Sequence, residues 1–304
     1  MRLNIQNETG KLKTVVLGLP YSPGDPPSLE EAFDAKSYHS VYTNTYPTED
    51  SIINEMNAFE RVLRKYQIEV LRPRNIEDCN QVFSRDIAFV IEDKIIFSNI
   101  IPDRAREKDA YQEIFASLSP ECIVHLPEEV HIEGGDVLVT EDHLFVGVCC
   151  NKNYKEYKTA RTNALAIEFL KEYFPKKEVL AFDLKKHDTD PLQGILHLDC
   201  AFNLVGKNRC LVYPEGFVHK EDYKKILDIY GEKNCFIISG EEAFEMFPNV
   251  FSISPEVVVS NTSFTRLNFF LKEKWGLTVE LVPYGEIAKM GGLLRCSTLP
   301  LVRD

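Results

Sequence analysis

The order of predicted elements along this chain repeats, and that repeat limits its fold more than any other feature. One unit has two short apolar runs around a polar turn, then a helix-like segment, then a third apolar run. The clearest unit has a hairpin at 86–99 that turns at Glu92–Lys94, a helix at 107–118 and a strand at 121–127. Apolar runs on both sides of a polar turn are typical of a β-hairpin. The unit is therefore strand–strand–helix–strand.

The same order recurs along the rest of the chain. Further predicted hairpins turn at Glu141–His143 and Gly206–Asn208, and a shorter version of the unit begins at 254. The helices and strands that follow them are predicted at 162–174, 178–184, 222–231, 234–239 and 277–283. The N-terminal part adds strands at 14–20 and 69–73 and, between them, a helix. Its apolar residues recur at helical spacing and are Ile52, Met56, Phe59, Leu63 and Tyr66.

The beginning and the end of the chain share one unit. The segment GGLLRCSTLP, Gly291–Pro300, supplies the strand that the N-terminal unit lacks. The chain thus contains roughly five units, and repeats of this size are typical of radial or linear arrays. Because one unit is completed from both ends, a closed ring of α/β units is favoured over an open solenoid.

Composition and charge narrow the class of protein. No linker or low-complexity tract divides the 304 residues, so we expect a single domain over 1–304. The formal net charge of −12, without a basic stripe, argues against nucleic acid as a partner. No apolar run is long enough for a signal peptide or a bilayer span, so we expect no membrane partner. The eight cysteines include no CxxC pair, which predicts reduced thiols, a cytoplasmic location, no metal site and no cofactor.

Polar clusters precede the hairpins at equivalent places, where a strand has no structural need of them. They are FSRD (83–86), HIEGGD (131–136) and HLD (197–199), with RCST (295–298) in the closing segment. Any one alone is most simply a turn, where Asp and Gly are common. In a closed ring, however, equivalent positions converge on one axis and would form one pocket. The predicted polar members of this pocket are Arg85, Asp86, Glu133, Asp136, His197, Asp199 and Cys296.

Cysteine, histidine and glutamate in one pocket are suited to nucleophilic catalysis. A free thiol has a pKa of about 8.5, so its surroundings must favour the reactive thiolate. His197 is placed to move protons, and Glu133 to orient the ring and stabilise the imidazolium. The carboxylates of Asp86 and Asp199 disfavour a general cysteine hydrolase but suit a cationic guanidinium, which they bind through paired hydrogen bonds. The pattern predicts attack of the Cys296 sulfur on a guanidinium carbon.

Five motifs, in the order FSRD, HIEGGDV, ARTN, HLD and GGLLRCSTLP, together resemble the guanidino-group modifying (pentein) superfamily. That superfamily includes arginine deiminases, dimethylarginine dimethylaminohydrolases and amidinotransferases, and the likeness covers about Thr14 to Arg303. The resemblance implies a five-bladed, pseudo-symmetric α/β-propeller that forms one catalytic domain.

The resemblance also implies a role for each polar residue of the pocket. Cys296 is the expected nucleophile, His197 the general acid and base, and Glu133 its partner. Asp86 and Asp199 are expected to bind the guanidinium.

A substrate α-carboxylate is expected to be bound by arginine side chains. The resemblance implies that Arg161, in ARTN, is a bidentate clamp for this group. Arg104 and Arg106 are further candidates for a second contact with it.

The motifs and the length point to different members of the superfamily. The compact length, without the helical insertion of arginine deiminases, is similar to dimethylarginine hydrolases. Those enzymes usually have Glu-Asp in place of Arg85–Asp86 and His-Leu-Lys in place of HLD, and they lack the RCxTxP pattern; all three features match arginine deiminases. Dimethylation would also deprive Asp199 of N–H donors. We therefore expect a deiminase-like hydrolase of arginine or a close derivative.

Three alternatives stay open beside this prediction. One is a dimethylarginine dimethylaminohydrolase, which releases dimethylamine and citrulline. Another is an amidinotransferase, a class that shares two of the three local features. A catalytically silent relative used for binding is disfavoured because all five polar groups are retained. For the enzymes the expected partner is a small guanidino compound, and monomer and homo-oligomer are equally compatible with the sequence.

Overall fold

The computed structural model describes residues 2–151 and 154–304. Within them the strands form five three-stranded sheets of one topology: the central strand pairs antiparallel with one neighbour and parallel with the other. In this order the sheets are β15 (Thr298–Arg303), β1 (Leu12–Leu17), β2 (Glu69–Leu71); β3 (Ala88–Ile91), β4 (Lys94–Phe97), β5 (Ile123–His125); β6 (Val137–Val139), β7 (His143–Val148), β8 (Glu178–Asp183); β9 (Phe202–Val205), β10 (Arg209–Val212), β11 (Cys235–Ile237); and β12 (Phe251–Ser254), β13 (Val257–Asn261), β14 (Thr278–Val282). The predicted α/β class and repeated unit are confirmed.

Helical segments connect the parallel strands of each sheet, as parallel pairing requires. The α-helices are α1 (Ala35–Tyr42), α2 (Glu49–Lys65), α3 (Gln112–Ala116), α4 (Ala164–Tyr173), α5 (Lys220–Tyr230), α6 (Gly240–Phe244), α7 (Thr265–Phe269) and α8 (Gly285–Ala288). The predicted helices at 162–174 and 222–231 are confirmed as α4 and α5. A π-helical turn, Phe270–Lys274, follows α7.

The helix predicted at 107–118 is confirmed only in part: α3 lies within it, and residues 107–111 are 3₁₀-helical. Most of this connection is a 3₁₀-helix, Pro102–Tyr111, and α3 is short. Side chains at i and i+3 eclipse in a 3₁₀-helix. That arrangement suits the buried ion pair of Arg104 with Glu107, whose atoms lie 2.7 Å apart. A local ion pair between residues three apart therefore accompanies the 3₁₀ geometry here.

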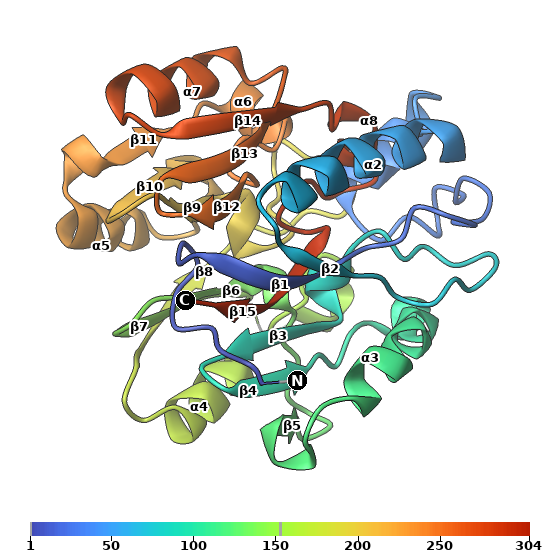
Figure 1. The fold of residues 1–304 in the computed structure, drawn as a ribbon, viewed down its shortest axis with the longest axis horizontal. Helices are drawn as coiled ribbons and strands as arrows, with labels where there is room; N and C mark the ends of the chain where they lie inside the picture. The colour runs from blue at the N-terminus through green and yellow to red at the C-terminus, as the bar shows by residue number, and fades with distance from the viewer. Residues whose placement is uncertain (1, 152–153) are drawn as a thin grey trace.

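The closing strand comes from the C-terminus, as the repeat predicted. In Figure 1, β15 in dark red lies beside β1 in blue, although the two strands come from opposite ends of the chain. Their antiparallel register places Leu12 opposite Arg303 and Leu17 opposite Thr298. The residues just before β15 are thereby fixed beside the N-terminal unit.

One strand, β12, was missed in the unit that forms the sheet β12–β14. We predicted that this unit begins at 254, but β12 starts at Phe251 and pairs antiparallel with β13. The segment FSIS alternates apolar and polar residues, as a strand does, but at four residues it is too short to stand out as one from the sequence. The residues before β12 therefore occupy the same place as the polar clusters before the other hairpins.

The long helix α2 joins the N-terminal unit to the fifth sheet, β12–β14. Its N-terminus is capped by the Thr48 side chain, which accepts a hydrogen bond from the Ser51 amide. The Phe59 ring is fully buried, with ring centres 5.8 Å from Phe251 and 5.6 Å from Tyr284. The predicted apolar face of this helix is thus confirmed as part of the core.

No helix in the described residues combines the length and the apolar character that crossing a bilayer requires.

Replacing Phe59 with alanine tests the contact between α2 and the sheet β12–β14. We expect the free energy of unfolding to fall by about 3–5 kcal/mol, because the substitution leaves a cavity between two aromatic rings. Tyr42→Ala is the matched control, since that side chain is 70% exposed, and we expect it to change stability by less than about 0.5 kcal/mol. Urea denaturation followed by circular dichroism measures both. Equal losses for the two variants would contradict this account of the core.

Candidate active site

Short polar turns stand before the first strand of each hairpin and hold the predicted site residues. Three of them are single 3₁₀ turns, Ser84–Asp86 before β3, Gly134–Asp136 before β6 and Leu198–Cys200 before β9. The middle turn contacts both of the others. The convergence that the sequence predicted for these clusters is therefore observed.

Glycines allow the turns to approach one another closely. A Cβ atom at Gly134 would lie 2.3 Å from the carbonyl oxygen of Arg85, and one at Gly135 would lie 2.6 Å from the ring of His197. Asp136 then links two turns: it accepts hydrogen bonds from Thr162 Oγ1 at 2.6 Å and from the amide of Leu198 at 2.8 Å. The predicted pocket residue Asp136 thus holds the turns together. It does not line the cavity of about 670 Å³ that His197 and Cys296 line.

His197 lies between two carboxylates. Its Nε2 is 2.9 Å from Glu133 Oε2, and its Nδ1 is 3.8 Å from Asp86 Oδ1. Burial lowers the pKa of His197, but the charge of Asp86 and the hydrogen bond to Glu133 outweigh it and raise the pKa to about 9. Burial raises the pKa of Glu133, but the Arg161 charge and the His197 hydrogen bond outweigh it and lower the pKa to about 2. At neutral pH the pair is an imidazolium and a carboxylate.

Cys296 is buried and contacts an amide side chain that we did not predict. Its sulfur accepts a hydrogen bond from Asn249 Nδ2 at 3.1 Å, and its amide donates to Asn249 Oδ1 at 3.2 Å. The sulfur also lies 3.9 Å from Asp199 Oδ2. Asn249 precedes the missed strand β12, at the place that the polar clusters occupy before other hairpins. Correct assignment of that strand would have found it.

Asp199 is paired within the protein. Its Oδ2 accepts a hydrogen bond from Arg295 Nη1 at 2.7 Å, and Oδ1 lies 3.6 Å from the thiol of Cys200. Arg295 Nη2 donates in turn to Glu8 Oε1 at 3.1 Å. Asp199 is therefore beside Cys296, as predicted, but one of its oxygens already has a guanidinium partner.

The arginines predicted to bind a substrate carboxylate have different surroundings. Arg161 is buried and donates to Glu133, to the Lys158 carbonyl at 2.6 Å and to the Phe33 carbonyl at 2.7 Å. Arg104 is buried and donates to Asp86 at 2.7 Å as well as to Glu107. Arg106 is exposed, and its one described hydrogen bond goes to the Asp78 carbonyl at 3.4 Å.

A cavity of about 670 Å³ connects these groups. Six of the predicted site residues line it: Asp86, Arg104, Arg106, Arg161, His197 and Cys296. Within the described residues, Asp86 Oδ1 and His197 Nδ1 are buried and have no hydrogen-bond partner. Unpaired polar atoms in a buried site are costly and call for a ligand or solvent partner.

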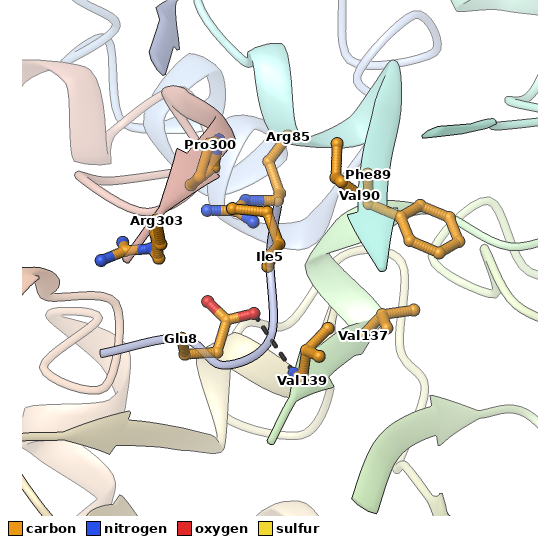
Figure 2. Close-up of a pocket in the computed structure, with 9 residues that line it drawn as sticks. All are labelled: Ile5, Glu8, Arg85, Phe89, Val90, Val137, Val139, Pro300 and Arg303. Atoms are coloured by element: carbon orange, nitrogen blue, oxygen red, sulfur yellow. Dashed lines mark hydrogen bonds between the residues drawn. The ribbon is translucent and has the colours of Figure 1, made fainter. Parts of the chain in front are cut away.

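Arg85 faces a different cavity from its neighbour Asp86. Figure 2 shows it with Glu8 and Arg303 around a small space on the other side of the turn. Its Nη2 donates to Thr298 Oγ1 at 3.3 Å, and its amide donates to the carbonyl of Cys296 at 3.0 Å. Burial and the charge of Arg295 lower the pKa of Arg85 to about 9. Arg85 therefore stabilises the closing segment through hydrogen bonds to Thr298 and Cys296.

A family model for N,N dimethylarginine dimethylhydrolase, eukaryotic, matches residues 30–303, which is nearly the whole chain. The chain belongs to this family. It is a guanidino-group modifying enzyme of the hydrolase type, as the five motifs predicted.

Curated relatives of this dimethylarginine hydrolase family member include an uncharacterized protein and several arginine deiminases. YkgA of Bacillus subtilis is 29% identical over 247 residues, which cover 78% of each chain. Arginine deiminases of Levilactobacillus brevis and Listeria monocytogenes are 28% and 25% identical and cover 74% of this chain. The matched region spans only 62% of the length of these deiminases.

Solved structures share the fold. SxtG, an amidinotransferase of saxitoxin biosynthesis from Microseira wollei, has a TM-score of 0.76 at 17% identity and covers 99% of this chain and 97% of its own. The N-terminal domain of ArgZ, a cyanobacterial arginine dihydrolase, has a TM-score of 0.76 at 16% identity and covers 96% and 98%. Because both identities are so low, these two structures show that the fold is shared and nothing more.

Three side chains of this family member stand close enough to share a metal ion. Ligand atoms of Asp86, Glu133 and His197 lie within 4.8 Å of one another. Each carboxylate already has cationic partners, because Asp86 is bonded to Arg104, and Glu133 to Arg161 and His197. The same grouping therefore also works as a charge-balanced network of protein side chains.

The pKa of His197 predicts a pH dependence of stability. A histidine whose folded pKa is raised from 6.5 to about 9 contributes stability that is complete below pH 6.5 and is lost as the pH rises through 9. His197→Gln can still donate to Glu133 but does not titrate. We expect the wild type to lose roughly 1–3 kcal/mol relative to this variant between pH 6 and pH 9.5.

Denaturation by urea at several pH values measures this difference. His219→Gln is the matched control, because the His219 side chain is 60% exposed. We expect its stability to run parallel to that of the wild type. A His197→Gln curve that is parallel too would mean that the histidine is not held in its protonated form.

Proposed function

We propose that this protein is a cysteine-dependent hydrolase of the guanidinium group of arginine or a close derivative. One observation carries the proposal: Asp86 Oδ1 and His197 Nδ1 are unpaired among the described residues and lie on the cavity that Cys296 lines. A guanidinium offers N–H donors on several edges and satisfies a carboxylate oxygen at that place. The nucleophile, the acid and an anionic site for the substrate then surround one carbon atom.

Cys296 acts as the nucleophile in this proposal. Its thiolate attacks the guanidinium carbon, and the tetrahedral adduct expels an amine to leave an S-alkylthiouronium intermediate. The hydrogen bond from Asn249 stabilises negative charge on the sulfur. Water then attacks the intermediate and releases the ureido product and the thiolate.

His197 supplies and removes the protons. With Nε2 held by Glu133, the protonated ring has its Nδ1–H on the side of Asp86, 3.8 Å from Oδ1, and His197 lines the cavity, where we propose that it protonates the leaving amine. The neutral ring then accepts a proton from the attacking water. Glu133 stabilises the imidazolium and keeps the ring oriented.

The guanidinium of Arg104 holds Oδ2 of Asp86 and leaves Oδ1 for a substrate guanidinium. Arg104 also lines the cavity, where it is one candidate contact for the substrate α-carboxylate. Arg106, with few partners of its own, lies on the same cavity and is a second contact for this carboxylate. Arg161 is the third arginine proposed for the substrate α-carboxylate. To bind that group, its guanidinium must give up hydrogen bonds to Glu133 or to the backbone carbonyls of Lys158 and Phe33.

Arginine is preferred over dimethylarginine in this proposal. Asp86 Oδ1 needs an N–H donor, and Asp199, whose second oxygen is held by Arg295, presents Oδ1 near the thiols. Two methyl groups on one nitrogen remove donors that these carboxylates would use. Hydrolysis of dimethylarginine is the second candidate, because the matching family model is described by that reaction.

The wider setting is part of the same proposal. We interpret the five sheets as blades of a pseudo-symmetric α/β-propeller and residues 1–304 as one catalytic domain. The eight cysteines are all free, which fits a reducing compartment such as the cytoplasm. The substrate is a small guanidino compound, whose binding a monomer or a homo-oligomer could equally perform.

Substitution of Cys296 tests the covalent mechanism. Cys296→Ala should lower kcat by at least about 10⁴-fold, because no other group replaces the sulfur nucleophile. Cys122→Ser is the matched control, since Cys122 is a half-buried cysteine outside the site, and it should keep nearly full activity. Steady-state assays of ureido product and circular dichroism spectra measure both. Substantial turnover by a folded Cys296→Ala protein would rule out the mechanism.

Competition between substrates decides the specificity. With equal arginine and asymmetric dimethylarginine present, we expect ammonia and citrulline to exceed dimethylamine by a factor of up to roughly 10⁴, since a site built for a donor rejects an analogue without it. Mass spectrometry of ammonia, dimethylamine, citrulline and ornithine is the measurement. Predominance of dimethylamine would assign the second candidate reaction, and ornithine formed only with an added amine acceptor would indicate amidino transfer.

A further inference from the structure

A second thiol lies beside Cys296, and the proposed mechanism does not use it. Cys200 follows Asp199 directly and ends the turn Leu198–Cys200. The interaction with the Cys296 side chain is the largest cause that raises the pKa of the Cys200 thiol. The two sulfurs also lie on the two oxygens of one carboxylate, Cys200 at 3.6 Å from Asp199 Oδ1 and Cys296 at 3.9 Å from Oδ2. Both cysteines are buried.

Both thiols are held from several sides. The amide of Cys200 donates to the His197 carbonyl at 3.0 Å, which fixes the turn. Cys296 is held through its amide and its sulfur by Asn249. A disulfide needs the sulfurs to close to about 2.05 Å, and here both sulfurs already lie beside the same carboxylate, that of Asp199.

Access to the two sulfurs differs. Cys296 lines the cavity of about 670 Å³, whereas Cys200 lines a neighbouring cavity of about 50 Å³. A small oxidant that enters the main cavity therefore meets Cys296 first. A thiolate, and not a thiol, reacts with peroxide.

We propose that Cys200 is a resolving thiol that makes oxidation of Cys296 reversible. Peroxide converts the Cys296 thiolate to a sulfenic acid, releasing hydroxide. The Cys200 sulfur then attacks the sulfenic sulfur, the Cys200–Cys296 disulfide forms, and the sulfenic hydroxyl leaves as water with the thiol proton of Cys200. The inference rests on the proposed function in one respect, namely that Cys296 is present as a reactive thiolate.

The surroundings of Cys200 favour this order of events. The hydrogen bond to Cys296, burial and the charge of Asp199 hold the pKa of Cys200 well above its usual value, so it stays a thiol in the reduced protein. Oxidation of Cys296 to a sulfenic acid removes the negative sulfur that this hydrogen bond stabilises. Cys200 then ionises more readily, at the moment when its attack is needed.

The disulfide also protects the protein from permanent damage. A sulfenic acid that meets no thiol is oxidised further to sulfinic and sulfonic acids, which thiol reductants do not restore. A disulfide between Cys200 and Cys296 stops that sequence and is reduced by thiols. The enzyme is thus switched off while peroxide is present and switched on again by reductant.

A peptide map of the peroxide-treated protein tests the disulfide directly. The full chain is treated with a small excess of hydrogen peroxide, alkylated without reduction and cut with trypsin. Trypsin places Cys200 in the peptide 187–207 and Cys296 in the peptide 296–303. We expect these two peptides to be cross-linked, with the cross-link lost after dithiothreitol. The buried pair Cys210 and Cys235, whose sulfurs are 3.3 Å apart, falls in other peptides and is the internal control.

Recovery of activity tests the role of Cys200. Each protein is compared with its own untreated sample, using wild type, Cys200→Ser and the control Cys235→Ser. We expect dithiothreitol to restore at least about tenfold more activity to oxidised wild type and Cys235→Ser than to Cys200→Ser, in which the peptide 296–303 should carry sulfinic or sulfonic acid.

Two results would overturn the proposal. One is sulfinic acid at Cys296 in the wild type without a cross-link to 187–207, and the other is equal recovery of Cys200→Ser and wild type. The peptide map needs no substrate and no activity. A wrong proposed function therefore appears as turnover by untreated Cys296→Ala, and a wrong redox inference as the missing cross-link.

Discussion

The ion pairs of Arg295 hold together the segments on which the site depends. Its guanidinium is almost completely buried and donates to Asp199 at 2.7 Å, Glu8 at 3.1 Å and the Val137 carbonyl at 2.7 Å. A buried charge is tolerated only when it is paired with opposite charge and hydrogen-bonded. The N-terminal segment, β6, the turn before β9 and the closing segment must therefore all be in place at once. The next residue along the chain is Cys296, so its position depends on a contact made by the whole fold.

Much of this arrangement could be predicted from the sequence because it follows from repetition. Apolar runs and turn residues located the hairpins, and the equivalent placement of FSRD, HIEGGD and HLD predicted that distant residues would meet. The contact of His197 with Glu133 at 2.9 Å and the nearby Asp86 agree with that reasoning. The same logic missed Asn249, because β12 is only four residues long and its short alternation was not recognised as a strand. One wrong element boundary was enough to hide a residue in contact with the sulfur.

Side-chain partners could not be predicted, because they depend on competition among charges in three dimensions. Arg104, Arg106 and Arg161 are equivalent in the sequence, as cations near a predicted pocket. In the fold, Arg104 and Arg161 are buried against carboxylates, and Arg106 stays at the surface. Burial decides this difference, since a guanidinium removed from water must find acceptors, whereas an exposed one has water. The 3₁₀-helix that carries Arg104 also contains its ion-pair partner Glu107.

The buried charges that surround His197 compensate one another before a substrate binds. The carboxylates of Asp86, Glu107 and Glu133 face two guanidinium groups and a protonated imidazole, those of Arg104, Arg161 and His197. A bound guanidinium adds one positive charge that this network does not balance. A thiolate at Cys296 supplies the missing negative charge, so substrate binding and ionisation of the proposed nucleophile favour each other. This coupling explains how a sulfur nucleophile can stand 3.9 Å from the carboxylate of Asp199, because the bound cation offsets the repulsion between the two negative groups.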